Sequence, residues 1–247
     1  MLVEHYQNMQ EALDHTRAAL LNYGQLVKTK NWQSEETKLG MWEINNYVFA
    51  TEVPEGKEGL NKILKPDQPW AEMHFQERVC GHPINPAPSY LAWPYYQGDE
   101  VWRKHGEKFA HTYPERMWVH RMPGVRFEYG NLDNVVKLLD RDPMTRQAFL
   151  PIWFPEDTGS MGNYRVPCTI GYHFIIRDDE LNMVYYIRSC DYRRHFKNDV
   201  YLACRLLQWV LNELWKLDSL NHGRITIGTL TMYITNLHVF EGEQELI

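Results

Sequence analysis

Cysteine is the residue type in this sequence with the most reactive side chain, and its four positions lie far apart. None belongs to a Cys-x-x-Cys pair, so the spacing favours neither a zinc ribbon nor a small disulfide framework, and we expect no bound metal. Reduced thiols are the expected state, and a thiolate beside positive charge is a soft, strong nucleophile. The candidates for such a role are Cys80, Cys168, Cys190 and Cys204.

Two arginines are candidates for binding an anion near such a thiolate. Arg188 begins an Arg-Ser-Cys-Asp sequence, and Arg146 follows Asp-Pro-Met-Thr. The planar guanidinium offers a rigid fork of donors to two phosphate oxygens at once. The cluster of Arg188 with Arg193, Arg194 and His195 has a simpler interpretation as a solvated edge, the usual fate of a charge run. We apply that interpretation to Arg193 and Arg194, but not to Arg188.

The segment around Cys168 resembles the catalytic centre of thymidylate synthases. In that family a Pro-Cys dipeptide supplies the nucleophile, an Arg-Ser-x-Asp motif follows, and a polar residue that reads the base precedes a long buried helix. This sequence has Pro167-Cys168, then Arg188-Ser189-Cys190-Asp191, then Asn198-Asp199, in the same order. The resemblance spans roughly residues 125 to 240. It implies that Cys168 is the nucleophile, whereas the other three cysteines remain small buried hydrophobic residues.

Two flanking segments resemble substrate-binding motifs of the family, each with one change. The family's Asp-Pro-x-(Ser/Thr)-Arg-Arg segment reaches across a homodimer to the partner's nucleotide phosphate; here Arg146 matches the first arginine and Gln147 replaces the second. The sequence GTLTMY resembles the sugar-binding His-x-Tyr stretch, with Tyr233 retained and Thr231 in place of histidine. The substrate-binding residues that the resemblance implies are Arg188, Ser189, Arg146, Asn198, Tyr233, Thr231 and Lys28.

Position 199 bears on which base is read. Eleven residues after the arginine of the Arg-Ser motif, uracil-using members of the family place asparagine, and this chain places Asp199. An ionised carboxylate only accepts hydrogen bonds, so it suits the N4 amino group of cytosine and not O4 of uracil. The sequence Phe-Lys-Asn-Asp resembles the phage deoxycytidylate hydroxymethylases. Two alternatives stay open: a shift of one residue that brings Asn198 to the base, and Asp199 as the N-cap of the following helix.

Three further residues take roles from the resemblance alone. Glu72 is the candidate general acid/base that assists proton movement at the ring, with Glu77 as an alternative. Glutamates on helix surfaces usually have no chemical role. Asp191 resembles an aspartate that contacts folate, and Lys28, in the sequence VKTKNW, is placed near the phosphate.

The resemblance implies one-carbon transfer to C5 of a pyrimidine nucleoside monophosphate. Cys168 adds to C6, and the C5 carbanion takes the methylene group of the co-substrate 5,10-methylenetetrahydrofolate. Water then gives a hydroxymethyl product, whereas hydride gives a methyl product. We expect 5-hydroxymethylation of dCMP, or of CMP, with dCMP or dUMP methylation as the alternative. A second alternative is a catalytically silent relative that binds nucleotide or RNA for regulation, suggested by Gln147 and Thr231.

Composition favours a small anionic substrate over a nucleic-acid polymer. The net charge is −6, and a nucleotide needs only a few well-placed arginines. No apolar run approaches the roughly 20 residues that span a bilayer, and the first residues are amphipathic and acidic, so we expect a cytoplasmic protein (in the host cytoplasm if phage-encoded). With 44% hydrophobic and 23% charged residues, we expect residues 1–247 to form a single domain.

A strand-rich C-terminal half must position these residues. Apolar periodicity predicts helices at residues 3–21, 70–79, 132–143 and 200–217, and strands at 41–54, 149–154, 169–178, 182–191 and 224–240. Residues 54–69 and 82–94 are rich in Gly, Pro or charge and are predicted to be loops, whereas 95–130 has no clear periodicity. The expected fold is α+β and thymidylate-synthase-like, a large mixed β-sheet packed with a long buried helix and surrounding helices.

Overall fold

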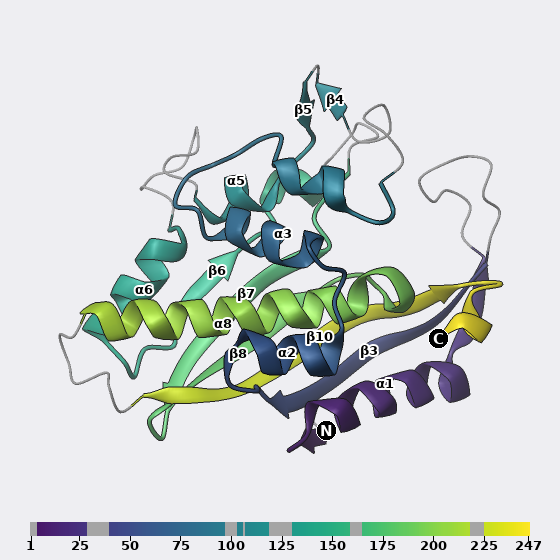
Figure 1. Ribbon diagram of the computed structural model, residues 1–247, viewed down its shortest axis with the longest axis horizontal. Helices are drawn as coiled ribbons and strands as arrows, with labels where there is room; N and C mark the ends of the chain where they lie inside the picture. The colour runs from purple at the N-terminus through teal and green to yellow at the C-terminus, as the bar shows by residue number, and fades with distance from the viewer. Residues whose placement is uncertain are drawn as a thin grey trace.

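A large mixed β-sheet forms the centre of the structure, a computed structural model that describes residues 4–28, 40–96, 103–105, 107–118, 130–158, 165–217 and 225–247. Within these residues eight strands pair in the order β1-β3-β10-β8-β7-β6, with β2 also paired to β3 and β9 to β10 (Figure 1). β10 runs antiparallel to β3 and parallel to β8. The strands are β1 (Glu4–Tyr6), β2 (Gln25–Lys28), β3 (Gly40–Glu52), β6 (Phe149–Pro151), β7 (Thr169–Arg177), β8 (Glu180–Ile187), β9 (Cys190–Asp191) and β10 (Thr226–Phe240).

Helices cover this sheet, and the longest of them is α8. In Figure 1 α8 lies across the strands, and α2 and α3 pack against it. The helices are α1 (Met9–Tyr23), α2 (Gly56–Leu64), α3 (Trp70–Arg78), α5 (Tyr113–Met117), α6 (Leu132–Arg141), α7 (Pro155–Thr158) and α8 (Lys197–Leu217), with the shorter turns η1 (Pro88–Ala92), η2 (Tyr192–Phe196) and η4 (Gln244–Leu246). A separate hairpin joins β4 (Arg103–His105) to β5 (Lys108–Phe109). The predicted α+β architecture is therefore confirmed.

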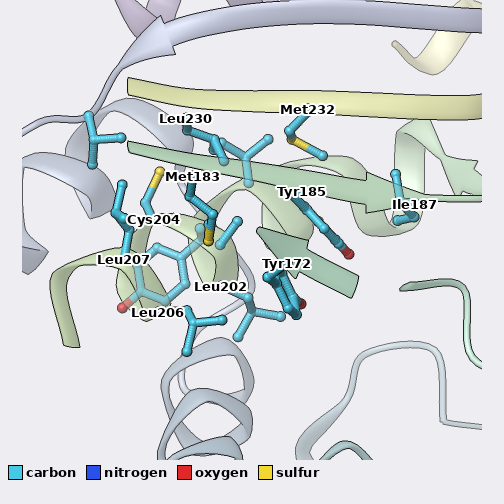
Figure 2. Close-up of a cluster of buried hydrophobic side chains, with 14 of the residues drawn as sticks. Tyr172, Met183, Tyr185, Ile187, Leu202, Cys204, Leu206, Leu207, Leu230 and Met232 are labelled. Carbon is cyan, nitrogen blue, oxygen red and sulfur yellow. The ribbon is translucent and has the colours of Figure 1, made fainter. Parts of the chain in front are cut away.

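The main core lies between α8 and one face of the sheet. Figure 2 shows Leu202 and Leu206 of α8 in the same buried cluster as Tyr172 of β7 and Tyr185 of β8. The two tyrosine rings stack with their centroids 4.7 Å apart. Truncating a buried leucine here to alanine should cost about 2–5 kcal/mol, because such cores relax little around a cavity. The sheet is thereby fixed to the helix whose first turn carries Asp199.

The opposite face of the sheet, which we call the outer face, carries partly exposed aromatic side chains. Side chains alternate along a strand, so Tyr186 and Tyr233 point away from the buried Tyr185 and Met232. Phe149 lies against Tyr186, with ring centroids 6.2 Å apart, and Tyr186 lies 6.1 Å from Tyr233. Phe149 is 39% exposed. This row of three rings crosses β6, β8 and β10.

Three elements differ from the sequence prediction. Residues 56–64, predicted to be a loop, form α2, because Leu60 and Leu64 share one helical face and are fully buried. The N-terminal helix starts at Met9, since residues 4–6 extend and pair with β3. The last predicted strands are one strand, β10. No helix in the described parts of the chain has the length and apolar character needed to cross a lipid bilayer.

Candidate active site

Cys168 lies in the bend immediately before β7, and it is exposed. The Arg188 side chain is held against the same stretch of chain. Its Nε donates to the carbonyl oxygen of Pro167 at 2.9 Å, and a terminal nitrogen donates to that of Val166 at 3.2 Å. The Arg188 backbone N–H donates to the Cys168 carbonyl oxygen at 2.9 Å. These hydrogen bonds bring together the predicted nucleophile and the predicted phosphate ligand.

Opposing charges act on the Cys168 thiol. Cys168 is open to solvent. Even so, the protein atoms packed around its thiol displace water from it, and this desolvation raises the pKa of the thiol above the ordinary value. The positive charges of Arg188 and Arg165 lower the pKa, whereas the carboxylates of Asp199 and Asp191 raise it. A bound anion that pairs with the arginines, or a base that neutralises Asp199, would change this balance. The reactivity of the thiol therefore depends on what occupies the site.

Asp199 lies in the first turn of α8. Its negative charge raises the pKa of the Cys168 thiol. The Cys190 thiol donates to Oδ2 of Asp199 at 3.6 Å. Burial raises the pKa of Asp199 to about 7; the charge of Arg78 and the Cys190 thiol oppose this, and Asp191 adds to it. A carboxyl group of this kind changes its charge near neutral pH, so it can serve either as an acceptor only or as a donor and acceptor.

The side chain of the neighbouring Asn198, a residue that is 4% exposed, is hydrogen-bonded to Asp67. Its Oδ1 accepts from the backbone N–H of Asp67 at 2.9 Å, and its Nδ2 donates to the Asp67 carboxylate at 2.9 Å and to the Arg194 carbonyl oxygen at 3.2 Å. Asp199 is not an N-cap. Asp191 caps η2, the π turn that leads into α8, by accepting from the backbone N–H groups of Arg193 and Arg194.

A buried group of three tyrosines and one arginine lies next to the segment that carries Cys168. This group was not predicted from the sequence. The Arg78 guanidinium lies 3.9 Å from the centroid of the Tyr113 ring and donates to the Tyr172 hydroxyl at 3.2 Å. Thr169, the residue after Cys168, donates to the Tyr113 hydroxyl at 3.1 Å and lies 2.9 Å from that of Tyr185. Burial raises the pKa of the Tyr113 hydroxyl, and the charge of Cys168 adds to the rise.

Signals for these residues were present but weak. Tyr113 opens α5, whose Thr-x-x-Glu sequence forms a capping box between Thr112 and Glu115, with Pro114 in the first turn. That pattern predicts a helix start inside the stretch left unassigned. Arg78 lies in the predicted short helix, but nothing in the sequence indicates that its side chain is 3% exposed.

Glu72 and Glu77 lie on α3, and each accepts hydrogen bonds from residues other than Cys168 and Asp199. Glu72 accepts from the Tyr201 hydroxyl at 2.6 Å and from Arg205 at 3.2 Å, both on α8. Glu77 accepts from the Ser89 hydroxyl and from its backbone N–H, each at 2.5 Å. Burial raises the pKa of Glu72, but hydrogen bonds from Arg205, Tyr201 and Gln76 outweigh it and lower the pKa to about 2. The general acid/base role of Glu72 stays a prediction.

Glu72→Gln is expected to lower the free energy of unfolding at pH 7 by about 1–3 kcal/mol, because it breaks a charged network. A carboxylate with a lowered pKa stabilises the fold above its unfolded pKa, and the gain is lost as pH falls toward about 2. Urea unfolding should therefore show a smaller difference in the free energy of unfolding between wild type and Glu72→Gln at pH 3 than at pH 7. Glu213→Gln, which removes an ion pair with the exposed Lys216, is the control and should change stability little. An equal loss at both pH values would contradict the assignment.

The other predicted substrate ligands come from several strands of the sheet and the segments beside them. Arg146 is exposed just before β6, and its carbonyl oxygen lies 3.1 Å from His173 Nε2. Tyr233 donates to Asn46 at 3.3 Å from the outer face, and Thr231 lies two residues before it on β10. Lys28 is exposed at the end of β2, and the residues that follow it, 29–39, lie outside the described chain. Ser189 is partly buried between β8 and β9.

A second aromatic group lies near Asp191. The rings of Trp93 and His195 stack with centroids 5.3 Å apart and planes 23° apart, and Tyr95 lies 5.6 Å from Trp93. The Arg194 guanidinium lies 5.6 Å from the centroid of the Tyr95 ring. Burial raises the pKa of Asp191 to about 6, and the backbone N–H and charge of Arg194 oppose the rise. His195 is thus part of an aromatic surface and not of a solvated charged edge.

Comparisons with known proteins connect this geometry to a family. A family model described as thymidylate synthase matches residues 92–246, more than half of the chain. A protein of Methanococcoides burtonii named "Putative thymidylate synthase" is 22% identical over 170 residues, covering 66% of this chain and 70% of that protein. A protein of the same name from Methanosarcina barkeri is 22% identical over 143 residues. That match covers 57% of this chain and 58% of the Methanosarcina protein, which is less than two thirds of its length.

A solved structure agrees with this match. The thermostable thymidylate synthase A from Bacillus subtilis has a TM-score of 0.65 at 14% identity, with 96% of this chain and 81% of that chain covered. The predicted thymidylate-synthase-like fold is therefore confirmed. The region that matches the family model includes Cys168, Arg188 and Asp199, whereas α3 lies before it. This chain belongs to the thymidylate synthase family.

Proposed function

We propose that this chain transfers a one-carbon unit from 5,10-methylenetetrahydrofolate to C5 of a pyrimidine nucleoside monophosphate, with 5-hydroxymethylation of dCMP, or of CMP, as the favoured reaction. Family membership supports the reaction class. The observation that carries the choice of cytosine is Asp199. The charge of Asp199 acts on the Cys168 thiol and raises its pKa. Asn198, the alternative base reader, is instead hydrogen-bonded to Asp67.

The chemistry follows from the side chains around the thiol. The Cys168 thiolate forms a bond to C6, and the electron pair of the C5–C6 double bond moves to C5, which becomes nucleophilic. Arg188, which lowers the pKa of Cys168, also serves in this proposal as a phosphate ligand. The Asp199 carboxylate accepts from the N4 amino group of cytosine and, when N3 carries a proton, also from N3. The Tyr113 hydroxyl, bonded to Thr169, lies close enough to Cys168 for their charges to interact.

The residues near Asp191 fit a reduced folate. A pterin ring is flat and carries N–H donors, so it suits a buried carboxylate beside aromatic rings. Asp191, Trp93 and His195 supply such groups in this chain. We propose that these residues hold the co-substrate, which supplies the one-carbon unit when bound.

The first test is release of tritium from C5-labelled dCMP, CMP and dUMP in the presence of methylenetetrahydrofolate, with the products identified by mass. Release from a cytosine nucleotide with a hydroxymethyl product is the expected result. A methyl product would keep the cysteine chemistry and replace hydroxymethylation by methylation. Preference for dUMP would contradict Asp199 as a reader of cytosine. Nucleotide binding without release from any substrate would favour the silent relative suggested by Gln147 and Thr231.

We also propose a homodimer formed through the outer face. Phe149, Tyr186 and Tyr233 leave apolar ring surface on that face, and a second copy would cover it. Arg146 is exposed three residues before Phe149, so it could reach across such an interface. The dimer thus supports the proposed contact of Arg146 with the partner's nucleotide phosphate.

Mixing two inactive variants tests this contact across subunits. Cys168→Ser retains Arg146, and Arg146→Ala retains Cys168, so a mixed dimer contains one complete site. After unfolding and refolding together in equal amounts, activity should return to about a quarter of the wild-type value, since half of the dimers are mixed. Each variant refolded alone is the control. No recovery, or a monomer by solution mass, would contradict the proposal.

A further inference from the structure

The Cys190 thiol makes a contact that the proposed chemistry does not use. It donates to Oδ2 of Asp199, with the sulfur 3.6 Å from the oxygen. Cys190 belongs to β9, which pairs with β10 at Leu237, and it is 1% exposed. Asp199 follows the η2 turn, in the first turn of α8, and is partly exposed. The hydrogen bond therefore joins a residue fixed in the sheet to the proposed base reader.

This contact makes the two carboxyl oxygens of Asp199 different. Oδ2 accepts from the thiol, whereas Oδ1 accepts no hydrogen bond from the described residues. Burial, and then the charges of Asp199, Asp191 and Cys168, raise the pKa of Cys190 well above its ordinary value, so the thiol keeps its proton at neutral pH. A thiol donates but is only a weak acceptor. Oδ2 is therefore the oxygen that accepts, and a proton on the Asp199 carboxyl lies on Oδ1.

The difference between the oxygens matters only for a group whose two ends are unlike. A carboxylate presents an acceptor from either oxygen. A neutral acid has one hydroxyl and one carbonyl oxygen, and an asparagine at this position has one NH₂ group and one oxygen. Because the thiol donates to the oxygen that accepts, the hydroxyl or the NH₂ group takes the place of Oδ1.

Cytosine and uracil differ most clearly at C4, where cytosine carries an amino donor and uracil carries the acceptor O4. An acceptor at the Oδ1 position matches cytosine, and a donor there matches uracil. If an amide or a neutral acid turned over so that its two ends exchanged, it would accept from N4 of cytosine and donate to N3. Base choice therefore depends on the orientation of the side chain as well as on its type.

We infer that Cys190 is a positioning residue that determines base specificity: by donating to Oδ2, its thiol leaves Oδ1 as the atom that reads the group at C4 of the base. This inference rests on the proposed function, in which Asp199 reads the base. With Oδ1 in that place, ionised Asp199 matches cytosine. Neutral Asp199 matches uracil, as an asparagine would.

Both charge states of Asp199 are present near neutral pH, because burial raises its pKa to about 7. The ratio of kcat/KM for dCMP to that for dUMP should therefore rise in the wild type as pH rises through this value. The charged or titratable groups that act on Asp199, or on which its charge acts, are Arg78 of α3, Tyr113 of α5, Cys168, Tyr172 of β7, Tyr185 of β8, and Cys190 and Asp191 of β9.

The test adds Cys190→Ala, which removes the donor, to the wild type and to Asp199→Asn. In Asp199→Asn it should raise the ratio of dCMP to dUMP about tenfold, because the amide can then turn over and read cytosine. In the wild type at pH 9 it should change the ratio by less than about twofold, because a carboxylate reads the same way in either orientation. At pH 6, where most of Asp199 is neutral, the ratio should rise again. Cys190→Ser should have a smaller effect, because a hydroxyl still donates.

Each ratio comes from one preparation, so it does not depend on the fraction of folded enzyme. Cys204 supplies the control, because it is a second fully buried thiol, within the apolar cluster of Figure 2. Cys204→Ala should leave every ratio unchanged. An unchanged ratio when Cys190→Ala is added to Asp199→Asn, or an equal change in Asp199→Asn and in the wild type at pH 9, would overturn the inference. Wild-type enzyme that acts on neither base would instead refute the proposed function.

Infrared spectroscopy tests the contact without substrate or activity. The S–H stretching band of Cys190 is the difference between the spectra of the wild type and Cys190→Ala, or Cys190→Ser if the alanine variant does not fold. Asp199→Ala should move this band to higher frequency, because the hydrogen bond is lost. In the wild type the band should move to lower frequency as pH rises through about 7, because a carboxylate is a stronger acceptor than a neutral acid. A band that responds to neither change would overturn the inference.

Discussion

Cys168→Ser is expected to reduce tritium release from every nucleotide substrate by at least about a thousandfold. The serine hydroxyl is far less acidic and less nucleophilic than a thiol, and within the described residues no general base is hydrogen-bonded to the Cys168 side chain. Arg188 and Arg165 favour a thiolate at this position, but their charge cannot ionise a hydroxyl near neutral pH. The measurement is the single-turnover rate of release with saturating methylenetetrahydrofolate.

Two controls separate chemistry from folding. Cys80→Ser changes a partly exposed thiol that donates to the His82 carbonyl oxygen, and it should leave the rate within about twofold. Cys168 is itself exposed, so the free energy of unfolding of Cys168→Ser should lie within about 0.5 kcal/mol of the wild-type value. Nucleotide binding should also persist. Release by Cys168→Ser at more than a tenth of the wild-type rate would remove Cys168 as the nucleophile.

Asp199→Asn is expected to reverse the choice of base. The amide can donate to O4 of uracil and accept from N3–H, and it no longer presents two acceptors to a protonated cytosine. Base-reading contacts of this type discriminate by about 1–3 kcal/mol, so the ratio of kcat/KM for dCMP to that for dUMP should fall by about 5- to 150-fold. The reversal should hold from pH 6 to 9, because the asparagine side chain does not titrate.

The neighbouring position supplies a matched control. Asn198→Asp places a second carboxylate against Asp67, where Nδ2 now donates, so it should destabilise the fold by about 1–3 kcal/mol. It should leave the ratio of the two substrates unchanged. If Asn198→Asp altered the ratio and Asp199→Asn did not, the residue that reads the base would be Asn198. Asp199 would then act only through its charge.

Local sequence predicted the C-terminal part of this site more closely than the N-terminal part. Cys168 and Arg188 come from the ends of two paired strands, so alternating apolar residues and short spacings already place them near each other. The resemblance of the motifs to the family predicted the thymidylate-synthase-like fold, and apolar periodicity predicted the buried helix whose first turn carries Asp199. The roles of the individual residues remain proposals.

Residues that approach from α3 and α5 could not be placed from the sequence. Arg78 and Tyr113 lie more than fifty residues before Cys168, and only the tertiary fold brings them to Thr169 and Tyr172. A helix of nine residues has room for charged side chains on several faces, so its sequence does not show which one is buried. α2 was missed because two lysines and one glutamate make its sequence polar despite the two buried leucines. In each case packing against distant elements outweighed local composition.

The π turn at Tyr192–Phe196 restricts how the sequence before position 199 can change in length. A π turn holds one residue more than an α turn, so it absorbs a mismatch between β9, which is fixed in the sheet, and α8, which is fixed in the core. Loss of one residue from it would require α8 to rotate by about 100° or the turn to tighten. A substitution at position 199 therefore leaves the backbone in place, whereas an insertion or deletion nearby would exchange the neighbours of Asp199 and Asn198 together.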